Sequence, residues 1–173
     1  MVKMHSISYN EFLKKSLHAE LRIDDRNTND CEQNVYYQIE CPSGTILTVQ
    51  YNIGMVPIIK KLPYSDDLAL SLNCHIYLIN LENMKIEFSF VSNTVCEMIK
   101  IYAEDLFFVC EAEIIVFNVP LKKIIQTIYL PEMVVNIDED SAGKLFISLY
   151  DQNHYTIKKE NNQYQIQKIE NRQ

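Results

Sequence analysis

Glycine is scarce and tryptophan is absent: the 173 residues include only three glycines, Gly44, Gly54 and Gly143. Loops that cradle phosphate groups need several glycines within a few residues. The sequence therefore excludes the common nucleotide-binding motifs, and it contains no G-x-S-x-G nucleophile motif. It also lacks any run of about 20 apolar residues, the length of a membrane-spanning helix, and its first residues lack the apolar core of a signal peptide. We therefore expect a cytoplasmic protein without a membrane anchor.

Positive charge is also in short supply. Lysine and arginine number 16 against 23 aspartates and glutamates, which gives a net charge of −7. A surface that binds nucleic acid needs a basic footprint, so we expect no direct contact with nucleic acid. Hydrophobic residues make up 47% of the chain and charged residues 23%, proportions that are typical of a folded globular protein.

Residues that commonly bind metals or cofactors form no known motif here. An odd number of cysteines without C-x-x-C argues against a zinc site or a disulfide framework. We expect reduced thiols at Cys31, Cys41, Cys74, Cys96 and Cys110. The histidines are not spaced as metal ligands: His5, His18, His75 and His154. The sequence thus predicts no metal, no cofactor and no catalytic residue.

One helix is expected near the N-terminus. Ser8 and Glu11 have the spacing of a capping box, in which a hydroxyl and a carboxylate satisfy the first backbone N–H groups of a helix. Phe12, Leu13, Leu17 and, one turn further, Leu21 then share one helical face. Residues 24–30 are polar and predict a linker. We therefore divide the chain into an N-terminal helix and linker, 1–30, and a β domain, 31–173.

Short runs of valine, isoleucine, tyrosine and phenylalanine alternate with turn residues after residue 34. They predict strands at 35–41, 45–51, 68–72, 75–80, 85–91, 94–102, 106–110, 113–117, 123–130, 144–149, 154–159 and 163–169. Parallel strands would need long crossover segments, and no stretch of that length separates these runs. The sequence therefore predicts an all-β protein of antiparallel strands with one short helix.

Part of the sequence repeats itself. Residues 67–81 match residues 105–119 without a gap, an offset of 105 − 67 = 38 residues, and the match includes the pairs Asn80/Asn118 and Lys85/Lys123. A third copy starts at Lys144 and needs one inserted residue to reach Tyr164. A fainter copy precedes them, from residue 36 to residue 49.

The order of strands and turns within one repeat resembles a blade of a β-propeller of the tryptophan-aspartate-repeat type, although the Gly-His and Trp-Asp signatures of that family are both missing. Such blades have four strands and a period of roughly 40–45 residues. The resemblance implies a propeller-like stack of antiparallel meanders. An incomplete ring and a β-sandwich of similar sheets are both compatible with it, since four blades is the lower end for propellers.

Carboxylates recur at one position of the repeat, just before or at its first strand. If equivalent turns lie on one face, they form an acidic rim that would attract a basic partner. The predicted partner-binding residues are Asp66, Asp67, Glu104, Asp105, Asp138, Glu139 and Asp140.

Small size, acidity and the absence of a catalytic motif favour a non-catalytic binding protein. In general character the chain resembles the bacterial immunity proteins encoded beside contact-dependent or polymorphic toxins, which are commonly small, acidic and cytosolic. That resemblance implies a basic nuclease toxin as the partner, with its active site occluded by the bound protein. Two alternatives stay open: a propeller-like scaffold or adaptor in a larger complex, and a hydrolase that uses dispersed carboxylates.

Overall fold

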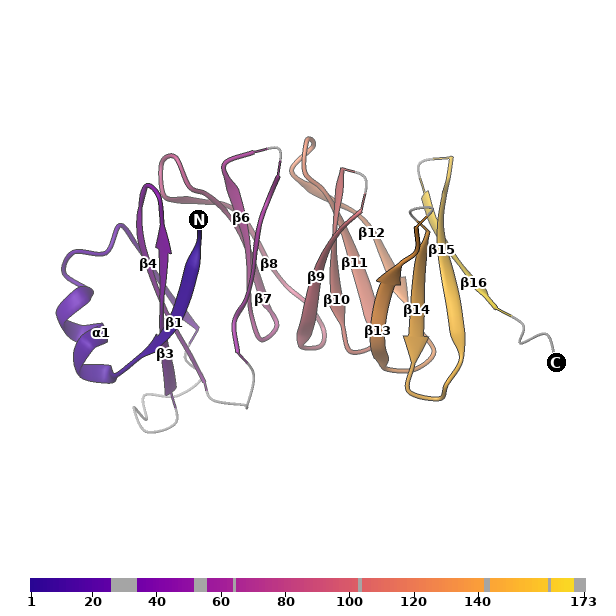
Figure 1. The fold of residues 1–173 in the computed structure, drawn as a ribbon, viewed down its shortest axis with the longest axis horizontal. Helices are drawn as coiled ribbons and strands as arrows, with labels where there is room; N and C mark the ends of the chain where they lie inside the picture. The colour runs from indigo at the N-terminus through magenta and orange to yellow at the C-terminus, as the bar shows by residue number, and fades with distance from the viewer. Residues whose placement is uncertain are drawn as a thin grey trace. The chain divides into compact units, whose positions relative to one another are not determined.

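The computed structural model contains sixteen β-strands and one short helix in its described residues (Figure 1). These residues are 1–25, 34–51, 56–63, 65–102, 104–141, 144–161 and 163–169. The chain divides into two compact units, Met1–Asn93 and Thr94–Gln173. Each unit contains two four-stranded sheets, so the prediction of an all-β protein is confirmed.

The first unit holds the first and second sheets. In the first sheet the order is β1 (Lys3–Ile7), β3 (Asn34–Cys41), β4 (Gly44–Tyr51) and β2 (Leu21–Asp25), with β2 parallel to β4 and the other pairs antiparallel. The second sheet is a simple antiparallel meander: β5 (Ile58–Lys61), β6 (Asp67–Leu72), β7 (His75–Asn80) and β8 (Lys85–Val91).

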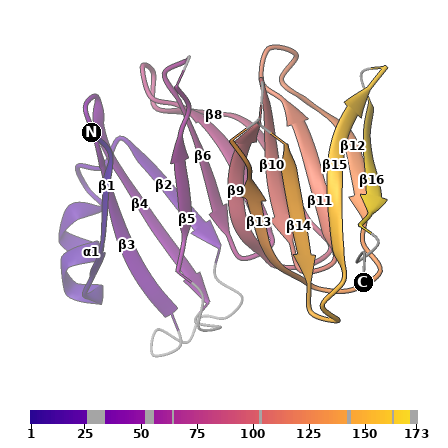
Figure 2. The ribbon, with the colours of Figure 1, turned by 45° about the vertical axis from the view of Figure 1, so that its right-hand side comes forward.

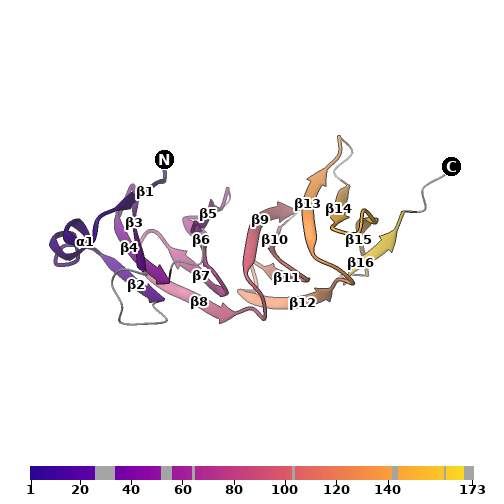
Figure 3. The same ribbon diagram turned by 90° about the horizontal axis from the view of Figure 1, so that it is seen from below.

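The second unit holds the third and fourth sheets, which are also antiparallel meanders. The third sheet contains β9 (Cys96–Tyr102), β10 (Asp105–Cys110), β11 (Glu113–Asn118) and β12 (Lys123–Tyr129). The fourth contains β13 (Val134–Glu139), β14 (Leu145–Leu149), β15 (His154–Glu160) and β16 (Gln163–Lys168). Figures 2 and 3 show these two sheets face to face, with strands that follow one another across each sheet.

The helix α1 (Tyr9–Lys15) forms as its capping box predicts. The Ser8 hydroxyl accepts from the backbone N–H of Glu11 at 3.3 Å, and the Glu11 carboxylate accepts from the backbone N–H of Ser8 at 3.0 Å. Phe12 is buried, with its ring centroid 4.9 Å from that of Tyr36 on β3. The predicted apolar face was wrong beyond Phe12, because Leu13 and Leu17 are exposed and Leu21 lies in β2.

Residues 1–25 belong to the first sheet rather than to a separate helix and linker. β1 pairs with β3 and β2 pairs with β4, so strands of the first sheet flank α1 on both sides in the sequence. The rest of the predicted linker, 26–33, lies outside the described residues. With seven residues, α1 is too short to cross a membrane, and no other helix occurs in the described part of the chain.

The repeat is confirmed strand by strand. β6, β7 and β8 begin and end 38 residues before β10, β11 and β12, and the bulge between Leu78 and Ile79 recurs between Val116 and Phe117. Leu68 and Leu106 are both buried, as are Ile76 and Ile114. A third matched pair is exposed in both copies: Ile86 is 40% exposed and Ile124 37%, and both lie on the outermost strand of their sheet.

The turn that closes each copy is built by an asparagine. The Asn80 side-chain oxygen accepts from the backbone N–H of Asn83 at 3.1 Å, and the Asn118 oxygen accepts from that of Leu121 at 2.9 Å. Asparagine favours turns because its short side chain bonds to the nearby backbone. The residue before each outer strand then has a positive φ, 54° at Met84 and 48° at Lys122.

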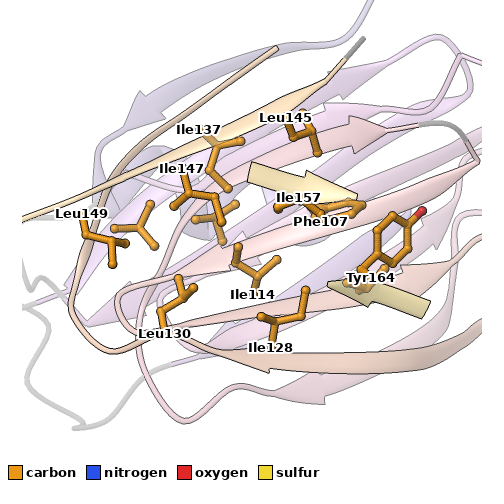
Figure 4. Close-up of a cluster of buried hydrophobic side chains, with 13 residues drawn as sticks. Phe107, Ile114, Ile128, Leu130, Ile137, Leu145, Ile147, Leu149, Ile157 and Tyr164 are labelled. Carbon is orange, nitrogen blue, oxygen red and sulfur yellow. The ribbon is translucent and has the colours of Figure 1, made fainter. Parts of the chain in front are cut away.

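Each unit buries one core between its two sheets. In the second unit, residues of the third sheet such as Phe107, Ile114 and Ile128 pack against Ile147 and Ile157 of the fourth (Figure 4). In the first unit the core includes the following side chains from the two sheets: Ile23, Ile39, Ile46, Leu68, Leu70 and Leu72. Packing of this kind is the main source of stability for sheets with an apolar face.

The first and fourth sheets each have a second face that points away from the core of their own unit. Phe12 of α1 covers the face of the first sheet that carries Tyr36 and Leu47. The fourth sheet instead presents polar pairs: Ser148 Oγ lies 3.1 Å from His154 Nδ1, and Lys158 Nζ donates to Gln167 Oε1 at 3.3 Å. These residues alternate along their strands with the core residues, so they point away from the third sheet.

Paired truncations test the equivalence of the two copies. Leu68→Ala and Leu106→Ala should each lower the free energy of unfolding by about 2–5 kcal/mol, because both leave a cavity in a core. Ile86→Ala and Ile124→Ala, the matched controls on the outer strands, should each cost about 0.5 kcal/mol. Urea titrations of the four variants provide the measurement. A large cost at one member of a pair and a small cost at the other would show that the copies are not equivalent.

Candidate functional site

The structure separates the seven predicted carboxylates into buried and exposed groups. Asp67 and Asp105 are buried, because each is the first residue of the central strand of its sheet, β6 or β10. They cannot contribute to an exposed acidic rim. The other five are exposed in turns or at a strand end: Asp66, Glu104, Asp138, Glu139 and Asp140.

Asp105 is the centre of a polar network between the third and fourth sheets. Its Oδ2 accepts from Lys159 Nζ at 2.8 Å and from the Tyr164 hydroxyl at 2.5 Å. Its Oδ1 accepts from the Asn118 amide at 2.6 Å. Since β15 and β16 supply Lys159 and Tyr164, the network joins the fourth sheet to the start of β10.

The same contacts determine the protonation states of Asp105 and Tyr164. Burial alone would raise the pKa of Asp105, but the hydrogen bonds from Lys159, Tyr164 and Asn118 outweigh it and lower the pKa below its usual value. Burial, together with the hydrogen bond to Asp105 and its charge, raises the pKa of Tyr164. The pair is therefore a carboxylate and a neutral phenol that donates to it.

Both the ring and the backbone of Tyr164 make close contacts with neighbouring residues. Its ring meets that of Phe107 edge-to-face at 4.9 Å, and Lys159 Nζ lies 5.0 Å from its ring centroid. The Gln126 side chain of β12 donates to the Tyr164 carbonyl at 2.6 Å and accepts from its backbone N–H at 2.7 Å. The side-chain amide of Gln126 thus makes the two backbone hydrogen bonds that a neighbouring strand would otherwise make with Tyr164 of β16.

Lysines share the end of the sheets that carries the predicted acidic rim. Successive antiparallel strands reverse direction, so every second turn lies at the same end. In the second unit this end, which we call the mixed-charge rim, includes the carboxylates of Glu104, Asp138, Glu139 and Asp140 and the ammonium groups of Lys122, Lys123, Lys144, Lys158 and Lys159. In the first unit, Asp66 pairs with Lys61 at 3.0 Å. The sequence-based expectation of an acidic rim did not include these lysines, because they lie in other turns than the carboxylates.

The opposite end of the second unit has a different surface, which we call the tyrosine rim: residues 95–97, 111–113, 129–133 and 150–153. Backbone hydrogen bonds connect its segments: Glu111 N–H donates to the Val95 carbonyl at 3.2 Å, Val134 N–H to Glu111 at 2.8 Å, and Tyr150 N–H to Met133 at 2.9 Å. Tyr150 is 75% exposed, Tyr129 70% and Met133 44%.

Carboxylates line the tyrosine rim as well: Glu97, Glu111, Glu132 and Asp151. Partial burial raises the pKa of Glu97, and the nearby charge of Glu111 raises it further. Asp151 accepts from the Asn153 backbone N–H at 3.0 Å, which lowers its pKa. This rim was not predicted from the sequence, because its residues are scattered over four segments. They meet at one end of the unit only because every second turn of an antiparallel meander lies at the same end of its sheet.

Two of the histidines, His75 and His154, form side-chain pairs. His75 Nδ1 lies 2.7 Å from Asp25 Oδ1, which joins β7 to the end of β2. Burial raises the pKa of Asp25, although the His75 contact opposes this. No group of three or more metal-ligating side chains occurs among the described residues, and Cys41, Cys74, Cys96 and Cys110 are present as thiols, with Cys31 outside the described residues.

Comparison with known proteins identifies the architecture. No protein-family model and no curated protein matches the sequence. A chain of the Mitotic Checkpoint Complex matches with a TM-score of 0.57 at 9% identity, over 79% of this chain and 45% of that one. The WD40 domain of Toxoplasma gondii coronin matches with a TM-score of 0.51 at 9% identity, over 94% of this chain and 49% of that one. The WD40 β-propeller domain of Doa1 matches with a TM-score of 0.51 at 13% identity, over 79% of this chain and 51% of that one.

The fold is that of WD40 β-propeller blades. The similarity favours the propeller alternative over a β-sandwich, and it holds without the Trp-Asp signature, since the sequence contains no tryptophan. The chain spans about half the length of the structures that it matches.

Removing the Tyr164 hydroxyl tests the network. Tyr164→Phe keeps the ring against Phe107 but leaves the buried Asp105 oxygen with one donor fewer, so we expect a loss of about 1–3 kcal/mol of unfolding free energy. Tyr150→Phe is the matched control, because its hydroxyl is at an exposed turn, and it should change stability by about 0.5 kcal/mol or less. Chemical denaturation of both variants measures the difference. Equal stabilities would contradict a stabilising role for the hydrogen bond.

The lowered pKa of Asp105 also predicts a dependence on pH. The folded chain binds this proton less tightly than the unfolded chain does, so the contribution is complete above the ordinary aspartate pKa of about 3.9 and is lost as pH falls through the folded value. The stability difference between wild type and Asp105→Asn should therefore shrink as the pH falls from about 5 to about 2. Asp66→Asn, at an exposed turn, is the control. A difference that stays constant with pH would contradict the assignment.

Proposed function

We propose that this chain is a non-catalytic protein-interaction module, a scaffold or adaptor of the propeller type. The observation that carries the proposal is a set of four-stranded sheets, two in each unit, with a 38-residue repeat, similar to the blades of WD40 domains. Such sheets hold their turns in fixed positions at two rims while the strands supply the core. One matched chain belongs to an assembly, the Mitotic Checkpoint Complex.

The charge pattern does not favour the toxin-immunity interpretation. In that interpretation a basic partner would bind an acidic rim, but two carboxylates of this rim are buried and the rest share their end of the sheets with lysines. No comparison supports an immunity protein or a nuclease partner. A hydrolase with dispersed carboxylates gains no support either, because the buried carboxylate Asp105 is engaged by Lys159, Tyr164 and Asn118.

Rims whose turns are already ordered favour binding of a partner more than flexible rims would. Binding costs conformational entropy when loops must be ordered, and the turns here are short and closed by backbone or asparagine hydrogen bonds. Partner surfaces of different kinds are also available, since the second unit has a mixed-charge rim at one end and the tyrosine rim at the other. Two rims allow two partners to be held at once.

The test is the capture and reconstitution of a complex. The full chain, tagged and expressed in its native cells, is cross-linked and purified, and the proteins captured with it are identified. The tag alone is the control. A scaffold predicts that at least one captured protein, purified separately, binds the purified chain directly and saturably by calorimetry, and that two captured proteins occupy it together in a ternary complex. Failure of every purified candidate to bind would contradict the proposal.

A further inference from the structure

We propose that the tyrosine rim is a docking surface for a basic protein segment in which lysine or arginine lies beside an apolar residue. This inference rests on the proposed function and names the surface and the chemistry of one partner. It differs from the sequence-based expectation, which placed a basic partner at the opposite end of the sheets.

The rim is continuous and its backbone is fixed. The 2.8 Å and 2.9 Å bonds described above attach Val134 to Glu111 and Tyr150 to Met133, and Leu130 N–H donates to the Ala112 carbonyl at 2.9 Å. Tyr129 is paired with Glu113 in the ladder between β11 and β12. Segments from the third and fourth sheets therefore present one surface that a partner meets without prior ordering.

The exposed side chains of this surface have the character of interface anchors. Tyr129 and Tyr150 each expose 70% or more of a large ring, and Met133 lies beside Tyr150 through their shared hydrogen bond. Tyrosine is enriched among the residues that dominate binding energy, because it combines a rigid apolar ring with a polar tip. Neither ring contributes to the core of the unit.

The charge around these anchors is predominantly negative. Glu97, Glu111, Glu132 and Asp151 lie in the same rim segments, and Lys168 is near enough to Asp151 to contribute to its lowered pKa. The mutual repulsion of Glu97 and Glu111 would be relieved by a bound cation. At the mixed-charge rim, by contrast, lysines already accompany the carboxylates. Charge complementarity therefore selects a basic partner and opposes nucleic acids and anionic membranes.

Random-peptide display against the purified full chain tests this proposal without a known partner. The expected enrichment is for lysine or arginine next to leucine, methionine or an aromatic residue. A fluorescent copy of an enriched peptide should bind about tenfold more weakly to Tyr150→Ala and to the double variant Glu97→Gln with Glu111→Gln. Its affinity for wild type should also fall as salt is raised.

Matched controls lie on the mixed-charge rim. Leu121→Ala and Glu104→Gln change an exposed apolar residue and an exposed carboxylate there, and both should leave peptide affinity unchanged. Thermal unfolding of every variant separates lost binding from lost folding. Enrichment of acidic peptides, or binding that responds to Leu121→Ala and not to Tyr150→Ala, would overturn the inference while leaving a scaffold function intact. Absence of any binding peptide together with absence of any reconstituted complex would overturn both.

Discussion

A sheet of four short strands that is apolar on a face must bury that face, and this requirement organises the whole chain. β6 and β10 are buried along all six of their residues. Within each unit the partner sheet covers the core face of these strands, and such packing of similar sheets favours repetition. The equal strand lengths of β6–β8 and β10–β12 fit this requirement, because an inserted residue in a strand would move its core side chains to the opposite face. Only the turns are free to vary.

The fourth sheet shows how a repeat can vary at a turn and gain a new contact. The turn between β15 and β16 joins Glu160 to Gln163, whereas the turn between β11 and β12 joins Asn118 to Lys123. The tighter turn extends β15 and brings Lys159 and Tyr164 to Asp105. Asp67 occupies the equivalent position in the second sheet, and its Oδ1 has no hydrogen-bond partner among the described residues. The same residue at the same place in the repeat therefore meets different surroundings.

Local patterns predicted most of the strands, the capping box at Ser8 and the repeat, because each depends on neighbours in sequence. The strands that were missed are β1, β2, β5 and β13. They are short or polar, and their identity depends on pairing with distant strands: Arg22, for example, lies in β2 only because Leu47 pairs with it. The expectation that Asp67 and Asp105 lie exposed in the acidic rim was wrong for a related reason. Whether an aspartate is the last residue of a turn or the first of a buried strand, as at Asp66 and Asp67, is a difference of one position.

The polar outward face of the fourth sheet has a consequence for self-association. A stack of similar sheets that ended in an apolar face would attract the same face of another molecule and could grow into fibres. Ser148, His154, Lys158 and Gln167 instead keep this face hydrated and occupied by their own hydrogen bonds. Replacement of these polar residues by valine or leucine would remove that barrier and would favour association of this face with the same face of another molecule.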